Sequence, residues 1–435
     1  MNNQIAPGKP DAVSRFPFYC ANTSPENDMT RSVFAAVLLA AACSSAFPQE
    51  KTRPPVVLTD AARQVHFENF VFDGHNDLPW EMRTKADSSF NKRDIAQAQP
   101  AMQTDIPRLR KGGVKAQFWS VYVPAETAKK GTALSDTLEQ IALVKAMIER
   151  YPDVFEAART ASDVERIAKQ GKIASLIGVE GGHAIENSIE NLRRLHALGA
   201  GYMTLTHSDT LAWADSATDK GQSQGLNPFG EEIVREMNRL GMLVDLSHVS
   251  DETMKDALRI SKAPIIYSHS SARAIASHPR NVPDDVLALV KANGGVVMVN
   301  FFPGFIVPRS AQIMAQMFDR SRELRAKFPN EADYQREQRR WERQNDYPSG
   351  SIHDVVDHID HLVKTAGIDC VGIGSDYDGI TKVPAQLEDV STYPLITQEL
   401  LNRGYKPADI HKIMSGNILR VMRGAEKVAA DIGSR

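Results

Sequence analysis

Cysteine is scarce in this chain of 435 residues, which contains only Cys20, Cys43 and Cys370. Three cysteines do not define a disulfide framework, and the first two lie in a segment that we expect the mature protein to lack. A strong charge of one sign is also absent, because the formal net charge is −3 and the pI is about 6.5. Without a basic face for phosphate backbones, nucleic acid is not an expected partner. A small-molecule ligand is expected instead.

A membrane-spanning apolar run is missing from the N-terminal region as well. The apolar run 33–42 is too short to span a bilayer, but it follows Met29-Thr-Arg-Ser and precedes small residues up to Ala46. This order is typical of a secretory signal, so we predict export to the periplasm or the medium, with cleavage after Ala46. A lipoprotein signal acylated at Cys43, or a buried N-terminal helix, are the alternatives. The expected organisation is a non-native extension at 1–28, a signal peptide at 29–46, a linker at 47–57 and one catalytic domain at 58–430.

Hydrophobic residues make up 42% and charged residues 24% of the sequence, which is typical of an ordinary globular protein. Eight short β-rich apolar runs alternate with helical patterns, and glycines follow several of these helices. The predicted strands are 70–73, 117–123, 173–179, 202–206, 242–247, 264–268, 295–301 and 370–375. The predicted helices include 133–149, 188–198, 230–240 and 283–292.

Eight βα units predict an α/β fold of the (β/α)₈ TIM-barrel type. An open doubly wound sheet is the alternative, but the glycine-rich phosphate loop GxGxxG is absent after the first strand. The charged segment 312–344 departs from the rhythm, and we predict an inserted, solvated helical excursion there.

Residues that could bind metal or move protons close many of the predicted strands, where a (β/α)₈ barrel places its active site. These residues are His75, Asp77, Glu180, His207, His248, His269 and Asp376. The other eight histidines are interpreted as surface, packing or supporting residues: His66, His183, His196, His278, His353, His358, His361 and His411. His358 and His361 share a helix face, but no HExxH glutamate accompanies them.

Even three of these four imidazoles and two of these three carboxylates exceed the number of ligands that one four-coordinate zinc needs. Two ions that share a bridging carboxylate would account for the surplus and would hold a hydroxide between them. Glu180 is the natural bridge, because its two oxygens can bind different ions. Asp376 is then available as the general acid and base that moves a proton from the attacking water to the leaving amine.

Seven motifs in the same order resemble the membrane dipeptidase (renal dipeptidase) family, over residues 65–425. They are 72–80 (FDGHNDLPW), 178–183 (GVEGGH), 204–208 (TLTHS), 245–250 (DLSHVS), 268–272 (SHSSA), 280–284 (RNVPD) and 372–379 (GIGSDYDG). The resemblance implies a barrel with two zinc ions that hydrolyses dipeptides, often with a D-residue on the C-terminal side. It also implies a homodimer. Animal members of the family carry a C-terminal lipid anchor that has no counterpart in this sequence, so any membrane anchoring would be N-terminal.

The resemblance also implies individual roles. His75 and Asp77 would bind one zinc, His248 and His269 the other, and Glu180 would bridge them. His207 would stabilise the oxyanion of the scissile carbonyl and Arg280 would bind the substrate carboxylate, beside Asp376. The segment 209–215 departs from the family pattern.

Two rival functions remain open from the sequence. One is an amidohydrolase-type barrel that acts on a cyclic amide, lactam or ester, although many such enzymes bridge their ions with a carbamylated lysine where this chain has Glu180. The other is a barrel that binds peptide or metal without turnover, which the loss of a ligand or of Asp376 would favour.

Overall fold

The computed structural model describes residues 53–434. The predicted extension, signal peptide and the first part of the linker lie outside these residues. The described chain begins with an extended segment that leads into helix α1 (Asp60–Phe67). Thr59 caps this helix, because its side chain accepts a hydrogen bond from the backbone N–H of Ala62.

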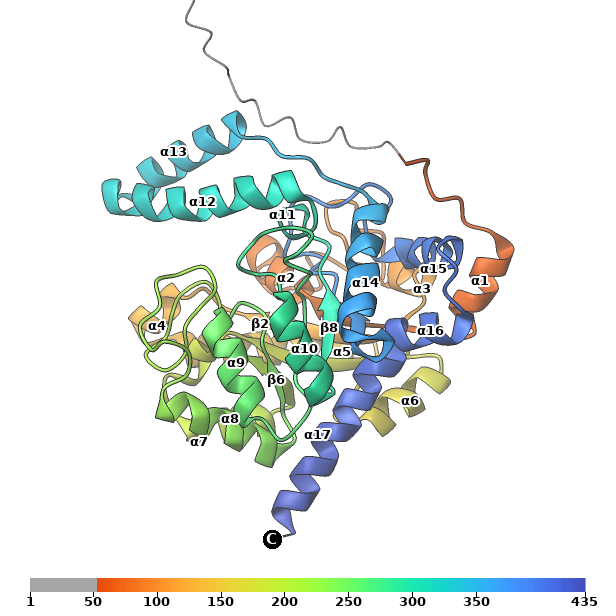
Figure 1. Ribbon diagram of the computed structural model, residues 1–435, viewed down its shortest axis with the longest axis horizontal. Coiled ribbons are helices and arrows are strands. Elements are labelled where there is room, and N and C mark those ends of the chain that lie inside the picture. Colours follow the sequence, from red (N-terminus) through yellow and green to blue (C-terminus); the bar gives the residue numbers. More distant parts are fainter. Residues whose placement is uncertain (1–52, 435) are drawn as a thin grey trace, which may run out of the picture. The chain divides into compact units, whose positions relative to one another are not determined.

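A closed barrel of eight parallel strands forms the centre of the molecule (Figure 1). Going round the barrel, the strands are β1 (Val71–Asn76), β2 (Val114–Tyr122), β4 (Ile173–Glu180), β5 (Ala200–Thr204), β6 (Leu243–Asp245), β7 (Ile266–Tyr267), β8 (Val296–Val299) and β9 (Val371–Ile373). Pairing of β2 with β4 and of β1 with β9 closes the ring. The predicted (β/α)₈ fold and all eight predicted strands are confirmed.

One strand was not predicted from the sequence. Strand β3 (Phe155–Ala157) pairs with the first residues of β4, outside the eight-strand ring. It has three residues, of which only Phe155 is buried, so it shows no alternation that would distinguish it from a loop. Its position adds a ninth strand to the sheet without changing the barrel.

Helices surround the barrel (Figure 1), and the longer ones bury one apolar face, as α8 (Pro228–Leu240) does with Ile233, Val234 and Met237. Those of the regular units and their connections are α2 (Leu78–Ala86), α3 (Ile106–Lys111), α4 (Glu126–Lys130), α5 (Ala133–Arg150), α6 (Ala161–Lys169), α7 (Ile189–Ala197), α8 (Pro228–Leu240), α9 (Asp251–Ile260), α10 (Asp284–Asn293), α11 (Pro303–Ile306), α14 (Ile352–Ala366), α15 (Tyr393–Asn402), α16 (Pro407–His411) and α17 (Asn417–Gly433). Short 3₁₀ turns lie at Gly182–Ile185, Ile368–Cys370 and Val390–Thr392, and a π-helical turn at Lys412–Gly416. The four predicted helices correspond to α5, α7, α8 and α10.

The charged segment forms two helices, α12 (Pro308–Lys327) and α13 (Glu331–Gln344), which lie side by side beyond α11 in Figure 1. They contact each other through Ser321 Oγ and Tyr334 Oη, 2.7 Å apart. Arg322 of α12 donates a hydrogen bond to the backbone oxygen of Thr218, in the loop that follows β5. The excursion is therefore helical as predicted, and it reaches back to a loop at the carboxyl end of the barrel.

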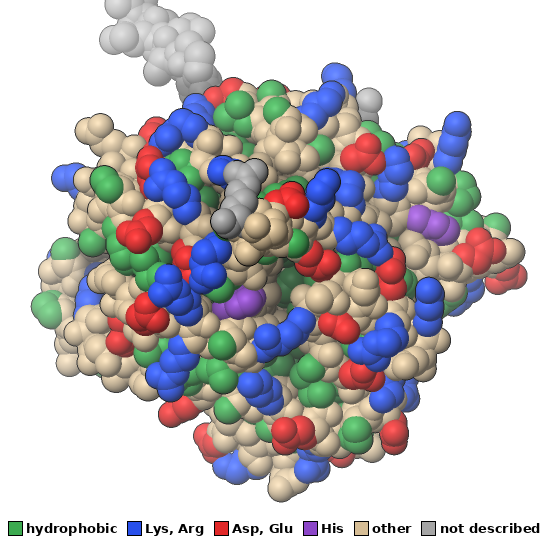
Figure 2. All heavy atoms as spheres, turned by 90° about the horizontal axis from the view of Figure 1, so that it is seen from below, with side chains coloured by type: hydrophobic (Ala, Val, Ile, Leu, Met, Phe, Trp, Pro, Cys, Tyr) green, Lys and Arg blue, Asp and Glu red, His purple; other side chains and the backbone are tan. Residues whose placement is uncertain are grey.

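The surface carries both charge signs side by side. On the face shown in Figure 2, lysine and arginine side chains are interspersed with aspartate and glutamate. Among residues 53–434, no helix combines the length and the apolar character needed to cross a bilayer.

Candidate metal centre

All seven predicted strand-end residues gather at the carboxyl end of the barrel. Nitrogen and oxygen atoms of these side chains form three overlapping groups, each with its atoms within 4.8 Å of one another. The groups are His75, Glu180 and His269; Glu180, His207 and His248; and His75, Asp77 and Asp376. Parallel strands bring their carboxyl ends to one edge, which explains why residues 300 positions apart meet here.

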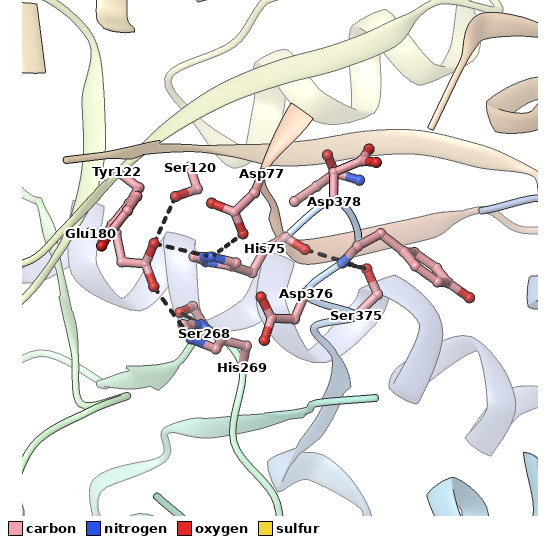
Figure 3. A network of polar contacts seen from close by, with 12 residues as sticks. His75, Asp77, Ser120, Tyr122, Glu180, Ser268, His269, Ser375, Asp376 and Asp378 are labelled. Atoms are coloured by element: carbon pink, nitrogen blue, oxygen red, sulfur yellow. Dashed lines mark hydrogen bonds and ion pairs between the residues drawn. The ribbon is translucent and has the colours of Figure 1, made fainter. Parts of the chain in front are cut away.

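Glu180, the last residue of β4, lies between two sets of side chains and is 5% exposed. Its Oε2 lies 3.5 Å from His75 Nε2 and accepts a hydrogen bond from Ser120 Oγ at 3.0 Å (Figure 3). Its Oε1 faces the other way, 3.1 Å from His248 Nε2 and 3.6 Å from both His269 Nε2 and His207 Nε2. The two carboxylate oxygens thus face different imidazoles, as a bridging carboxylate requires.

His75 offers a ring nitrogen that suits a metal ion. Its Nε2 is buried without a hydrogen-bond partner, although Asp77 Oδ2 lies 3.1 Å away. The other nitrogen, Nδ1, lies 2.9 Å from Tyr202 Oη. A buried polar nitrogen is normally paired, so the unpaired Nε2 beside two carboxylates fits a cation placed between them.

His248 and His269 approach each other with Nε2 atoms 3.0 Å apart. Two nitrogens bound to one tetrahedral zinc at about 2.0–2.1 Å would be about 3.3 Å apart, so this spacing fits a shared ion. His248 has a φ of +70°, in the left-handed region that non-glycine residues avoid. Strain of this kind persists at functional sites because the surrounding contacts impose it.

Burial and the neighbouring imidazoles shift the pKa values of the acidic side chains of the centre. Burial raises the pKa of Asp77, and it raises the pKa of Asp376 to about 7. For Glu180, burial also acts to raise the pKa, but the facing His75, His207 and His248 outweigh it and leave the pKa well below its usual range. Glu180 is therefore a carboxylate at neutral pH, whereas Asp376 has a pKa suited to proton transfer.

Most imidazoles of the centre are held neutral. Burial lowers the pKa of His207 to about 4 and lowers the pKa of His248 and His269 well below the ordinary value, with Arg280 adding to the effect. For His75, burial acts to lower the pKa, but Tyr202, Glu180 and Asp77 outweigh it and raise the pKa well above the ordinary value. Neutral imidazole is the form that binds metal, and a cation at His75 Nε2 would take the place of its proton.

A cavity of about 390 Å³ opens above these residues, a size suited to a small ligand. Its lining consists of Asp77, Trp80, Tyr122, Glu180, His207, His248, His269, Arg280, Phe302, Phe305, Asp376, Gly379, Ile380 and Thr381. His75 is fully buried beneath it. All the predicted site residues except His75 therefore line one cavity.

Arg280 is 2% exposed although it follows a proline in a loop. Its guanidinium donates hydrogen bonds to Ser270 Oγ at 3.2 Å and to the backbone oxygen of His269 at 3.3 Å, and Nε has no partner. It lies 5.1 Å from the centre of the Phe305 ring. Burial lowers the pKa of Arg280 to about 10, so it stays a cation at neutral pH and can bind an anionic group in the cavity.

Asn300 and two aromatic residues that line the cavity, Trp80 and Tyr122, were not predicted from the sequence. Asn300 Nδ2 donates a hydrogen bond to Asp376 Oδ2 at 2.9 Å, while its Oδ1 accepts from the backbone N–H of Phe302. Asn300 belongs to the predicted strand 295–301, and it was the one polar residue in that apolar run. Trp80 and Tyr122 pack edge to face with ring centres 5.0 Å apart and line the cavity. Trp80 stands in the first motif, at the end of the HxD segment, so its position was the available signal.

His358 and His361 do not meet on a metal. His358 Nδ1 accepts a hydrogen bond from the backbone N–H of Ala272, and its Nε2 lies 3.0 Å from the backbone oxygen of Ile306. His361 Nε2 lies 2.8 Å from Asp284 Oδ1. The interpretation of these two histidines as packing and surface residues agrees with these contacts.

Comparison with known proteins places this geometry in context. A family model described as membrane dipeptidase (peptidase family M19) matches residues 59–435. The crystal structure of the probable dipeptidase PvdM from Pseudomonas aeruginosa is 25% identical, with 85% of this chain and 98% of that chain covered and a TM-score of 0.75. A Rhodobacter sphaeroides metallopeptidase bound to a phosphinate mimic of L-Ala-D-Ala is 23% identical, with 82% and 99% covered and a TM-score of 0.68. A family M19 metallopeptidase described as dipeptidase AC is 24% identical, with 82% and 98% covered and a TM-score of 0.67.

Proposed function

This chain belongs to the membrane dipeptidase family and is a metallo-dipeptidase, and from that premise we propose that it uses two zinc ions bridged by Glu180. The observation that carries the proposal is the arrangement of the two Glu180 oxygens. One faces His75 and the other faces His248 and His269. We assign His75 and Asp77 to the first ion and His248 and His269 to the second.

When bound, the two ions supply a hydroxide at neutral pH and polarise the scissile carbonyl. The protein's own side chains supply the proton transfer. Asp376 takes the proton of the attacking water and passes it to the leaving amine, for which a pKa of about 7 is well suited. Asn300 holds the Asp376 carboxylate by a hydrogen bond at 2.9 Å, and the backbone of Asp376 has a φ of +69°.

Two other residues that line the cavity, His207 and Arg280, bind the substrate. His207 is a partly buried imidazole that is neutral at pH 7, and it donates a hydrogen bond to the oxygen on which charge develops. Arg280 binds the C-terminal carboxylate of the substrate through two parallel hydrogen bonds. Because the guanidinium is buried, that carboxylate must enter the cavity, and this limits the substrate to very short peptides.

The direct test is hydrolysis of a panel of L-L and L-D dipeptides before and after chelation and zinc return. We include L-Ala-D-Ala because the Rhodobacter sphaeroides relative binds a phosphinate mimic of it. We expect cleavage of dipeptides, loss of activity with chelator and recovery with zinc. Activity that is indifferent to chelation would contradict the two-metal proposal.

The same panel separates the rival functions. A lactam, a cyclic amide and an ester belong in it, because turnover of one of these without dipeptide cleavage would identify another amidohydrolase-type enzyme. Binding of zinc and dipeptide without turnover of any substrate would identify a non-catalytic barrel. Analytical ultracentrifugation of the same sample tests the proposed homodimer, and fractionation of expressing cells tests the proposed export and any N-terminal anchoring.

A further inference from the structure

Two buried aspartates lie beside the candidate centre without lining its cavity. Asp73 in β1 and Asp245 at the end of β6 are both 0% exposed. Asp73 precedes His75 by two positions and Asp245 precedes His248 by three. Buried carboxylates are costly unless their oxygens are hydrogen-bonded, so their partners show what they do.

Asp73 accepts four hydrogen bonds. Oδ1 accepts from the backbone N–H groups of His75 at 3.1 Å and Ser375 at 2.9 Å. Oδ2 accepts from the hydroxyls of Ser375 and Tyr393, each at 2.5 Å. Ser375 directly precedes Asp376, so Asp73 ties the end of β1 to the proton-transfer residue at the end of β9.

Asp245 repeats this pattern on the other side of the barrel. Oδ1 accepts from the backbone N–H groups of Ser247 at 3.1 Å and Ser268 at 2.8 Å. Oδ2 accepts from the hydroxyls of Thr204 and Ser268, each at 2.6 Å. Each aspartate also pairs in register with the residue two positions before its serine, Ile373 for Asp73 and Ile266 for Asp245.

The two serine hydroxyls differ in whether they contact an imidazole ring. Ser268 Oγ lies 2.8 Å from Nδ1 of His269, whereas Ser375 contacts no imidazole nitrogen (Figure 3). A hydroxyl has one hydrogen, and Asp245 accepts it, so Ser268 Oγ must accept a hydrogen bond from Nδ1–H of His269. His269 then carries no proton on Nε2, the atom that faces Glu180 and His248.

Close packing keeps Ser268 in this position. A Cβ atom at Gly374 would lie 1.9 Å from the backbone oxygen of Ser268, and one at Gly74 would lie 2.6 Å from it. Only glycine at these two positions lets Ser268 approach the strands that carry Asp73 and Ser375. The two aspartate networks are therefore packed against each other beneath the cavity.

We propose that Asp245, acting through Ser268, is a positioning residue that holds His269 in the Nδ1–H tautomer and so sets the affinity of the second metal position. Asp73, acting through Ser375, holds Asp376 in place. Asp73 and Ser375 contact only the backbone of His75 and not its ring, so this network leaves metal affinity unchanged. This inference rests on the proposed two-metal function.

Ser268→Ala tests the inference, with Ser375→Ala as the matched control, because each deletes one hydroxyl bonded to a buried aspartate. The chelated full-length proteins are titrated with Zn²⁺ against a chromophoric chelator, and with Co²⁺ while the visible absorption is recorded. We expect two ions in the wild type. In Ser268→Ala one ion keeps its affinity and the other binds about 10–100-fold more weakly, with an altered Co²⁺ spectrum. Ser375→Ala keeps both affinities and has a lower kcat.

Two unchanged affinities in Ser268→Ala would overturn the inference, and so would equal weakening in both serine variants, which would indicate general destabilisation. If Ser268→Ala does not fold, Asp245→Asn replaces it. The new amide can donate a hydrogen bond to Ser268 Oγ, so the Ser268 hydroxyl can donate to His269 Nδ1 and no longer requires a proton there. Asp245→Asn must then weaken one ion in the same way. A wild-type protein that binds no ions would instead contradict the proposed function itself, and the inference with it.

Discussion

The two sides of the Glu180 carboxylate differ in charge. On one side lie His75, Asp77 and Asp376, from the ends of β1 and β9, which we call the acidic half. On the other side lie His207, His248, His269 and Arg280, from the ends of β5, β6 and β7, which we call the basic half. The acidic half has two carboxylates beside one imidazole, and the basic half has three imidazoles and a guanidinium without a carboxylate.

This difference separates two tasks of one reaction. Burial raises the pKa of Asp77 and Asp376 in the acidic half, which suits the holding of a cation and the movement of a proton. Burial and Arg280 lower the pKa of His248 and His269 in the basic half, which keeps these imidazoles neutral and leaves a net positive charge on Arg280. An anionic substrate group is therefore attracted to the basic half and repelled from Asp376.

Glu180→Gln should have the largest effect, because it removes the one negative charge shared by both halves. A neutral amide cannot bridge two cations, and the buried imidazoles lose their facing carboxylate. We expect both bound ions to be lost or weakened and dipeptide hydrolysis to fall below detection. Metal content by mass spectrometry and an activity assay measure this. A variant that kept two ions and measurable activity would show that the halves are independent of Glu180.

Asp376→Asn should affect the acidic half alone. The amide cannot take a proton, so kcat should fall by about 10²–10⁴-fold, while KM and the content of metal change little. Steady-state kinetics with one good dipeptide measure the two constants. A rise in KM with unchanged kcat would assign Asp376 to substrate binding instead.

Arg280→Lys should affect the basic half alone and by less. A lysine keeps the charge but loses the two parallel hydrogen bonds, which are worth about 1.5–3 kcal/mol to a charged partner. The value of kcat/KM should therefore fall by about 10–100-fold, mainly through KM. The control substrate is the same dipeptide with its C-terminal carboxylate replaced by an amide. Its hydrolysis should be insensitive to the substitution. Equal losses for both substrates would contradict the assigned role.

His358→Gln lies outside both halves and should leave activity unchanged at neutral pH. His358 is fully buried, and burial lowers its pKa to about 4. Below pH 6.5 the unfolded chain binds a proton that the folded chain refuses, so stability is present at neutral pH and is lost as the pH falls towards 4. At pH 5 this amounts to about 2 kcal/mol.

Urea unfolding of the chelated protein between pH 7 and 4 measures this effect. The free energy of unfolding of His358→Gln should fall less steeply with acid than that of the wild type. The slope should not vanish, because burial also lowers the pKa of His66 and His278. Parallel slopes for the two proteins would contradict the assignment.

The sequence by itself determined the barrel and the identity of the residues at its strand ends. Alternation of β-rich runs with helical patterns is a local signal, and it predicted all eight barrel strands because each unit is built from neighbouring residues. The HxD pair at His75 and Asp77 was readable for the same reason. The short strand β3 was not, because three residues carry no period.

Only the tertiary structure decided the partners of these residues. Asn300 contacts Asp376 across 76 positions, and Asp73 bonds to Ser375 across 302, so no local pattern relates them. Asp73 and Asp245 both stood inside recognisable motifs, yet their equivalence depends on register and burial. Hydrogen-bond geometry and desolvation act through space, and they become visible only when the barrel has closed and brought its strand ends together.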